Sequence, residues 1–283
     1  MKKALSVLLI LLLTVSALTA CAPAAAPAPA AEPAEPASET PNIDRIKEAG
    51  VLILGTESTY PPFQFIVIEG GKSVGVGLDV DLGKLIADKI GVDFKTSEMA
   101  FDSLIPSLQA GTIDIAGSMT PTDERKLVID FSELYYESTN TFIVLKENEA
   151  AFGTKESFSG KTIGAQMGTV QNTLVVEEFT DSENLILPKV STLIQELKTG
   201  NIDAVCVEAP VADCYISAMP DQLALAEFSV PDSGGGVAIT MAKGADDLAA
   251  VVNEVLLEAM ADGTVEKLYN HNIELAKDQI VND

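Results

Sequence analysis

The sequence is poor in the residues that most often bind metals or form hydrolytic active sites. It has no tryptophan, three cysteines and a single histidine, His271, near the C-terminus. The usual zinc sites are built from several His or Cys ligands, and a Ser-His-Asp triad needs a histidine beside a reactive serine. The sequence therefore argues against both kinds of site, and we predict no metal, no cofactor and no catalytic residue.

Cysteine is too sparse for a disulfide framework. Besides Cys21, the chain has only Cys206 and Cys214. In an exported protein these two can form a disulfide, which would join a strand to the helix that follows it. Two buried free thiols are the alternative, which we favour. Both remain open at this point.

Basic residues are scarce as well. The 18 Lys and Arg residues stand against 42 Asp and Glu residues, which gives a formal net charge of −24. Such a charge argues against nucleic acid or an anionic membrane surface as a partner. Solubility outside the cell is a sufficient explanation for it. The charge says little about a ligand, because a buried site sets its own local charge.

The first 20 residues have the pattern of a bacterial signal peptide. Lys2 and Lys3 precede an apolar run over residues 4–15, which is too short for a stable transmembrane helix. The run ends in LTAC at residues 18–21, which resembles a lipobox. This resemblance implies cleavage before Cys21, a lipid on its thiol and attachment to the membrane through that lipid. An ordinary secretory signal with an unused cysteine is the alternative.

Residues 21–41 are almost entirely Ala, Pro, Glu, Ser and Thr after the cysteine. Such a segment cannot bury enough apolar surface to offset the entropy of ordering it, so we predict a solvated tether. The folded part then begins near residue 42, which leaves enough chain for one large domain or two smaller ones.

The folded part alternates short β-type runs with helical patterns, which indicates an α/β fold. Residues 51–55 predict a buried strand, and residues 79–90 predict a helix that Gly91 ends. Apolar spacing predicts a helix over residues 101–108, which starts late because of Pro106, and then a strand at 113–116. Residues 245–270 are predicted to be helical, with Gly263 closing the apolar stripe.

An internal repeat is the most informative feature of the organisation. Residues 103–114 (SLIPSLQAGTID) match residues 192–203 (TLIQELKTGNID) in the positions of Leu-Ile, Leu, Gly and Ile-Asp. Both segments predict a helix, a glycine turn and a strand, and each lies downstream of a strand led by glycine. Chance similarity of two such turns is the alternative. We interpret the repeat as two lobes built to one plan, since two copies are too few for a solenoid.

Six motifs in order resemble the polar amino-acid-binding proteins of ABC importers, which are family 3 extracellular solute-binding proteins. They are YPPF at 60–63, VGLDVDL at 76–82, FDSLIP at 101–106, MTPTDER at 119–125, DFS at 130–132 and YY at 135–136. The resemblance covers nearly all of residues 42–275. It implies a two-lobe periplasmic-binding-protein fold with the ligand in the cleft.

The lobes implied by the resemblance are 42–137 with 230–283 for lobe 1, and 138–229 for lobe 2. Two hinge crossings are expected, near residues 137–139 and 228–232. Such a build closes around a ligand by a hinge motion.

A free amino acid places a carboxylate and an ammonium on one carbon, and neither can be buried without a partner. Arg125 is the candidate for the carboxylate, because a guanidinium can bind it through two hydrogen bonds. Gly117, Ser118 and Thr120 are expected to add backbone N–H groups and hydroxyls. Glu208 follows the strand at 204–207, at the position where the resemblance implies an acid that binds the ammonium. An exposed arginine and a surface acid are the alternatives for the two charged groups.

The resemblance implies further ligand-binding residues. Gln166, Thr169, Val170 and Gln171 follow the first strand of lobe 2, where Gly168 would let the backbone approach the ligand. Tyr60 and Phe101 are expected to form walls around the ligand side chain, and Glu57 to lie near its end. An acid there suggests a cationic or amide-bearing ligand, although an exposed Glu57 would explain the sequence equally well.

We therefore predict an extracytoplasmic protein, lipid-anchored to the bacterial cell membrane, that binds a polar or basic L-amino acid and passes it to an ABC importer permease. Two alternatives remain. Some proteins of this fold are dehydratases that act on cyclic acids, and Glu208 and Glu57 are the only obvious acid or base candidates here. A ligand sensor for a separate membrane receptor is the other.

Overall fold

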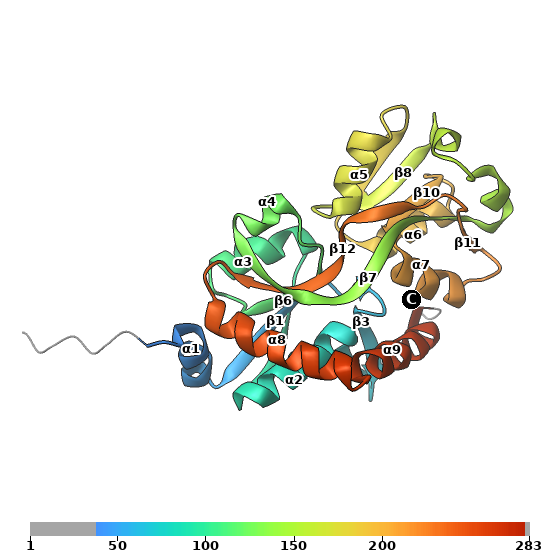
Figure 1. Cartoon of the computed structure of the whole chain (residues 1–283). Coiled ribbons are helices and arrows are strands. Elements are labelled where there is room, and N and C mark those ends of the chain that lie inside the picture. The colour runs from blue at the N-terminus through green and yellow to red at the C-terminus, as the bar shows by residue number, and fades with distance from the viewer. Residues whose placement is uncertain (1–37, 281–283) are drawn as a thin grey trace, which may run out of the picture. The chain divides into compact units, whose positions relative to one another are not determined.

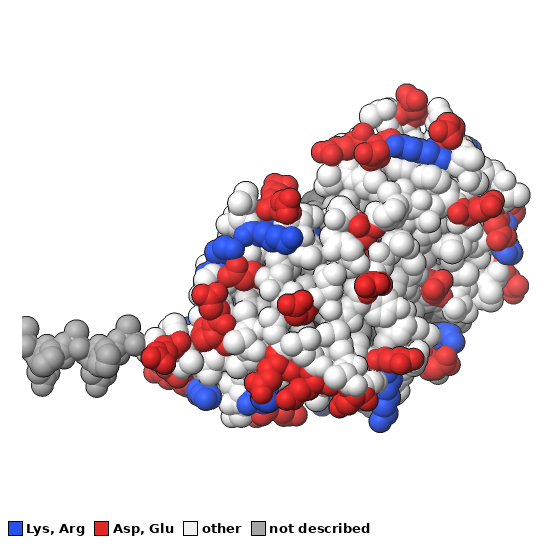
Figure 2. Space-filling model, viewed as in Figure 1, with Lys and Arg blue, Asp and Glu red and all other residues white. Residues whose placement is uncertain are grey.

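The structure of the protein is a computed structural model that describes residues 38–280. The predicted signal peptide, Cys21 and most of the predicted tether lie outside the described residues. Among the helices that are described, none is long and apolar enough to cross a membrane. Acidic side chains are spread over the face shown in Figure 2, as the excess of Asp and Glu predicts.

Most strands join in one mixed sheet. Its members are β1 (Val51–Thr56), β5 (Asp93–Glu98), β6 (Ile115–Met119), β7 (Ile129–Leu145), β8 (Thr162–Gln166), β9 (Glu183–Leu187), β10 (Ala204–Glu208), β11 (Leu223–Leu225) and β12 (Val230–Ala242). The order is β5-β1-β6-β12-β7-β10-β8-β9, and β11 pairs with β7. A separate small sheet contains β2 (Thr59–Tyr60), β3 (Gln64–Glu69) and β4 (Lys72–Val76).

The helices divide between the two ends of this sheet. We call lobe 1 the part built on β5, β1 and β6, with helices α1 (Pro41–Ala49), α2 (Leu78–Ile90), α3 (Leu104–Gln109), α4 (Asp123–Lys126), α8 (Asp246–Ala261) and α9 (Thr264–Ile280). Lobe 2 is built on β10, β8 and β9, with α5 (Val170–Glu178), α6 (Val190–Lys198) and α7 (Ala209–Ala218). Short 3₁₀ turns cover Phe101–Ser103, Lys146–Ala151 and Lys155–Phe158.

The long antiparallel strands β7 and β12 belong to both lobes and run between them (Figure 1). The two-lobe α/β fold with two crossing strands is therefore confirmed. Along the β7–β12 ladder, Pro231 pairs with Thr139, and the next registered pair is Gly236 with Glu137. Residues 232–235 thus bulge out of the ladder within the crossing. The residue limits of the lobes and the position of the hinge stay predictions.

The internal repeat corresponds to equivalent structure in the two lobes. In lobe 1, α3 is followed by Gly111 at φ 67° and then by β6. In lobe 2, α6 is followed by Gly200 at φ 75° and then by β10. Both glycines adopt the left-handed conformation that other residues rarely take. The two lobes therefore share the helix-turn-strand unit that the repeat predicts.

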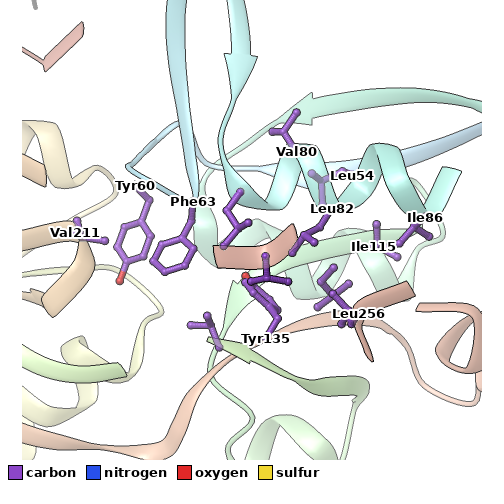
Figure 3. Close-up of a cluster of buried hydrophobic side chains, with 14 of the residues drawn as sticks. Leu54, Tyr60, Phe63, Val80, Leu82, Ile86, Ile115, Tyr135, Val211 and Leu256 are labelled. Carbon is purple, nitrogen blue, oxygen red and sulfur yellow. The ribbon is translucent and has the colours of Figure 1, made fainter. Parts of the chain in front are cut away.

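The hydrophobic core continues from one lobe into the other beside the crossing strands. Tyr60 and Phe63 of lobe 1 lie side by side, with ring centroids 6.2 Å apart. Val211 of α7 lies beside Tyr60 in Figure 3, and all three belong to one buried cluster. Burial of apolar surface at this place holds the lobes in contact.

The sequence prediction differs from the structure at two elements. The strand expected at residues 113–116 begins at Ile115 and runs on to Met119. The single helix expected over 245–270 is two helices that meet at Gly263, where φ is 79°, and the second extends to Ile280. Its later turns pack Ala276 in a cluster with Phe65 and the buried Cys214. That packing explains why the helix continues past the last predicted residue.

Both described cysteines are free thiols. Cys206 in β10 and Cys214 in α7 are buried and do not form a disulfide. Burial raises the pKa of the Cys214 thiol to about 12, so it stays protonated at neutral pH. The free-thiol alternative of the sequence analysis is the one that the structure supports.

Candidate functional site

A narrow cavity with about 10 Å³ of free space lies between the two lobes. Its lining comes from both lobes and consists of Glu57, Tyr60, Gln64, Phe101, Ser118, Thr120, Arg125, Gln166, Thr169, Val170, Gln171 and Glu208. Every residue that the sequence predicts for the ligand site is in this set except Gly117.

Arg125 enters the cavity from the short helix α4. The Thr122 side chain caps this helix by accepting a hydrogen bond from the Arg125 N–H at 3.2 Å. The guanidinium donates to the Thr120 carbonyl at 2.8 Å and, across the cleft, to the Gly168 carbonyl at 2.9 Å. Its centre lies 5.6 Å from the centre of the Phe101 ring. Two carbonyls and a ring thus fix the direction of the cation.

The electrostatic state of Arg125 favours binding of an anion. Burial lowers the pKa of the guanidinium, and the nearby Glu208 and Asp232 partly oppose that effect. Among the described residues, no carboxylate lies within ion-pair distance of it. A half-buried cation without a counter-ion is costly, so an anionic ligand group would stabilise it.

Helix α5 points its N-terminus at the same cavity. Thr169 caps the helix through its hydroxyl, which accepts from the Asn172 N–H at 3.1 Å. Val170 and Gln171 form the first helical positions and line the cavity. Their N–H groups have no partner within the helix, and the helix dipole adds positive charge there. This end of lobe 2 can therefore bind an anion together with Arg125.

Gly168, just before α5, permits the lobes to approach closely. Its φ is 78°, and a Cβ at this position would lie 2.9 Å from the Asp102 Cβ of lobe 1. Only glycine combines this backbone angle with so little space.

Glu208, at the end of β10, is the anionic group of lobe 2. The residue is only 2% exposed, and its Oε2 atom is buried with no hydrogen-bond partner among the described residues. Burial raises the pKa of this carboxyl to about 8, with Asp232 adding to the effect and hydrogen bonds from Tyr60 and Gln171 opposing it. The surface-acid alternative is therefore wrong. A ligand cation would satisfy the unpaired oxygen and favour ionisation.

Glu57, after β1, is the anionic group of lobe 1. It is also 2% exposed, which rules out the exposed alternative. Both carboxylate oxygens accept from the Thr59 hydroxyl, at 2.9 and 3.0 Å, and Oε2 accepts from Gln166 Nε2 of lobe 2 at 2.9 Å. Burial raises the pKa of Glu57 despite these hydrogen bonds. The two lobes thus meet at Glu57 and Gln166.

The segment from Gly117 to Thr120 differs from its predicted role. Gly117 lies in β6 against Asp79 and does not line the cavity. Ser118 lines it, but its N–H donates to the Tyr135 hydroxyl at 2.8 Å and its hydroxyl donates to Asp79 at 2.7 Å. Thr120 donates its hydroxyl to Asp232 at 3.3 Å. The two hydroxyls and the Ser118 N–H therefore have partners inside the protein.

The sequence analysis did not identify Gln64 as a cavity residue or Asp79 as its neighbour. Gln64 lies in β3, and its Nε2 donates to Asp79 Oδ2 at 2.5 Å. A usable signal was present: Asp79 is a charged residue between Leu78 and Val80, on a helix face that is otherwise apolar. Glutamine in a strand carried no comparable signal.

Comparison with known proteins identifies the family. A model of the bacterial extracellular solute-binding proteins, family 3, matches residues 52–274. The chain belongs to this family. As a family 3 extracellular solute-binding protein, it is placed outside the cytoplasm.

Among its family 3 relatives, the arginine-binding extracellular protein ArtP of Bacillus subtilis is 36% identical over 227 residues, which are 77% of this chain and 84% of ArtP. The crystal structure of the amino acid ABC transporter substrate-binding protein AbpA from Streptococcus pneumoniae, bound to L-arginine, has a TM-score of 0.80 and 33% identity. It covers 82% of this chain and 98% of AbpA.

A third similar structure is the ancestral amino-acid-binding protein AncCDT-1, a precursor of cyclohexadienyl dehydratase. It has a TM-score of 0.73 and 30% identity, and the match covers 82% of this chain and 99% of that protein. The family 3 fold is thus shared by binding proteins and by the ancestor of an enzyme. Within residues 38–280, no group of three or more His, Cys, Asp or Glu side chains is placed to bind a metal.

Proposed function

We propose that this solute-binding protein binds a basic L-amino acid, with arginine as the leading candidate, between its lobes and delivers it to an ABC importer. The observation that carries the proposal is the charge of the cavity. Its charged side chains are one cation, Arg125, and two buried acids, Glu57 and Glu208. Arginine carries one carboxylate and two cations, so the charges match one to one.

Each ligand group has a place of suitable chemistry. The carboxylate would bind Arg125 and the first turn of α5, and the α-ammonium would bind Glu208, whose Oε2 lacks a partner among the described residues. The side-chain cation would then lie toward Glu57, with Tyr60 and Phe101 as apolar walls. ArtP and AbpA, whose names or structures refer to arginine, support the same ligand class.

Binding calorimetry with arginine, lysine, citrulline and agmatine tests the proposal. Citrulline replaces the guanidinium by a neutral urea of similar size, and agmatine lacks the carboxylate. A ligand of about 10 heavy atoms at about −0.8 to −1 kcal/mol per atom gives a Kd on the order of 0.1 to 1 μM. We expect arginine in that range and both analogues at least about tenfold weaker, because each leaves a buried charge unpaired. Equal affinity for arginine and citrulline would overturn the basic-ligand proposal.

The lipid anchor is a separate part of the proposal. Cys21 follows the lipobox-like sequence and precedes a stretch rich in Ala and Pro, which suits a domain held near a membrane by lipid. Mass spectrometry of the mature N-terminus should show an acylated Cys21. Replacement of Cys21 by Ala should release the protein from the membrane fraction, with ligand binding unchanged. An unmodified Cys21 in the mature chain would contradict this part alone.

A dehydratase-type function is the second candidate. The pKa of Glu208, raised to about 8, keeps a proton available at neutral pH, as a general acid requires. The similarity to AncCDT-1, a precursor of such an enzyme, supports this candidate. Incubation with amino acids and cyclic acids, followed by mass analysis of the mixture, separates the two functions. Recovery of the bound ligand unchanged supports binding, and a loss of water from it supports the enzyme.

A further inference from the structure

Asp79 is a buried acid that lies behind the cavity and does not line it. It occupies the first turn of α2 and is 0% exposed. Its Oδ2 accepts from Gln64 Nε2 at 2.5 Å and from the Ser118 hydroxyl at 2.7 Å, while its Oδ1 accepts from the Tyr135 hydroxyl. Three donors from three different elements thus converge on one carboxyl group, although none of them is a cation.

One of these donors connects Asp79 to Glu57. The Gln64 amide gives its Nε2 to Asp79, so its Oε1 faces the opposite way and accepts the Glu57 N–H at 2.8 Å. An amide can satisfy both neighbours only in this orientation, because Asp79 accepts and the Glu57 N–H donates. Asp79 therefore determines which way the Gln64 amide points, and Gln64 holds the backbone from which the Glu57 side chain extends.

The other two donors hold a second part of the site, the segment around Ser118. Ser118 has a φ of 50°, in the left-handed region that costs energy for a residue other than glycine. Its hydroxyl is bound by Asp79, and its N–H donates to Tyr135, which itself donates to Asp79. Gly117 makes room for this arrangement, because a Cβ there would overlap the Asp79 carboxyl group.

We propose that Asp79 is a positioning residue that orients Gln64 and thereby fixes Glu57 for selection of a cationic ligand side chain. The inference rests on the proposed function, since it concerns how that site distinguishes a charged side chain from a neutral one. Asp79 acts through Gln64 and Glu57 and does not touch the cavity. Its contribution is therefore to selectivity among ligands, beyond its contribution to folding.

Replacement of Asp79 by Asn reverses the polarity at one point. The new side chain brings one donor to a point where three donors converge. Where that donor faces Gln64, the Gln64 amide turns its oxygen to it and its NH₂ to the Glu57 N–H. Two donors would face each other at Glu57. One lost buried hydrogen bond corresponds to about a tenfold change in affinity. We expect Asp79→Asn to lower the arginine-to-citrulline affinity ratio about tenfold, with citrulline binding changed by no more than about threefold.

Gln64→Met tests the same connection from the other side. It removes the amide while leaving Asp79 bound to Ser118 and Tyr135, and it should lower the affinity ratio to a similar degree. The double variant Asp79→Asn/Gln64→Met should lose no more than either single variant, since both break one chain of contacts. Asp81→Asn is the matched control: it removes the same charge from α2, where Asp81 binds Asn272 and Lys84 away from the cavity.

Calorimetry of these variants with arginine and citrulline, beside melting temperatures, decides the inference. A lowered ratio in Asp79→Asn and Gln64→Met, with non-additive effects and a normal ratio in Asp81→Asn, supports it. Equal weakening of both ligands, or additive effects, overturns it. If Asp79→Asn does not fold, an unchanged ratio in Gln64→Met overturns it and a lowered one supports it. A wild-type protein that does not prefer arginine would instead defeat the proposed function.

Discussion

Lobe 1 and lobe 2 share one plan but use it differently at the cleft. Gly55 of β1 faces Ile113 and Leu104, where an added Cβ would lie 2.5 and 2.8 Å from their side chains. Gly164 of β8 faces Ile202 and Leu193 in the same way, at 2.7 and 2.8 Å. The strand, helix and turn that support the site are thus equivalent in the two lobes.

The difference begins where the first strand of each lobe ends. After β8, a short loop leads directly into α5, whose N-terminus stays open to the cavity. After β1, the chain first forms the small sheet β2–β3–β4, and the first N–H groups of α2 donate to the Pro62 and Phe63 carbonyls. One lobe therefore offers backbone N–H groups to a ligand, while the other satisfies the equivalent N–H groups with its own backbone carbonyls.

A repeated unit can thus acquire ligand selectivity through a change in one of its two copies. In lobe 2, the helix end and Glu208 suit the groups that all amino acids share. In lobe 1, Arg125 also suits a group that all amino acids share, the carboxylate. Glu57, which Gln64 and Asp79 hold in position, suits only amino acids with a cationic side chain. The predictions below test this division, beginning with the largest expected effect.

Loss of Arg125 should have the largest effect. Arg125→Met removes the cation that spans the cleft and would leave a ligand carboxylate without its charged partner. We expect the Kd for arginine to rise at least about 100-fold, as when one partner of a buried charge pair is lost. Calorimetry measures this, with Arg45→Met as the control, because Arg45 is half-exposed and pairs with Asp114 away from the cavity. Unchanged affinity in Arg125→Met would remove Arg125 from the site.

Loss of the Glu208 charge should come next. Glu208→Gln keeps the size of the side chain but removes the partner of the α-ammonium. We expect arginine and citrulline to weaken alike, by about 10- to 100-fold, as for hydrogen bonds to charged groups. A selective loss of arginine alone would reverse the assigned roles of the two lobes.

The pH dependence of binding should report the titration of the same carboxyl group, that of Glu208. The pKa of Glu208 is raised from 4.5 to about 8 in the free protein, and a bound ammonium would lower it. Binding should then release a proton below pH 8, and affinity should rise with pH from about 6 to 8, by at most about tenfold per unit. Calorimetry in buffers of different ionisation enthalpy measures the released proton, which Glu208→Gln should abolish.

The stability of the unliganded protein should follow the opposite trend. A folded-state pKa above the unfolded value means that the folded protein holds the proton more tightly. The contribution of Glu208 to stability is therefore complete below pH 4.5 and is lost as the pH rises through about 8. Melting temperatures of wild type and Glu208→Gln across this range should diverge as the pH rises. Parallel curves would contradict the raised pKa.

The smallest expected effects are on stability, and they concern the aspartate that ends each copy of the repeat, Asp114 and Asp203. Asp114 accepts the Ile53 N–H at 2.8 Å, and Asp203 accepts the Thr162 N–H at 2.9 Å. The Asp114 side chain is 4% exposed and that of Asp203 is 33% exposed. Chemical denaturation should therefore show that Asp114→Ala costs about 2–3 kcal/mol and Asp203→Ala about 1 kcal/mol. Equal losses of unfolding free energy would mean that the different burial of the two aspartates does not affect how much each one stabilises the fold.

Much of the fold follows from local patterns in the sequence. The helix over residues 79–90 and the glycine turns at Gly111 and Gly200 depend on spacing within a few residues. Arg125 and Glu208 were identifiable because the family resemblance applies at positions that local sequence defines, the start of a helix and the end of a strand. Each therefore has a position that its neighbours in sequence determine.

The connection of Asp79 to Gln64 and Ser118 could not be predicted in this way. These partners lie 15 and 39 residues from Asp79, and their roles depend on which atoms face one another. The error at Gly117 has the same origin. A polar segment beside the site was taken to face the ligand, whereas Asp79 and Tyr135 take up its donors.

Gly168 allows the lobes to close around a ligand, whereas the charged groups that would bind the ligand do not depend on it. Arg125 donates a hydrogen bond to the Gly168 carbonyl. The side chain that would bind a ligand carboxylate therefore also contacts the opposite lobe. A methyl group at this position would meet Asp102 before the lobes came fully together. Every charged group of the site would keep its position, but the cleft would not close fully. The ligand would then stay in exchange with the surrounding water.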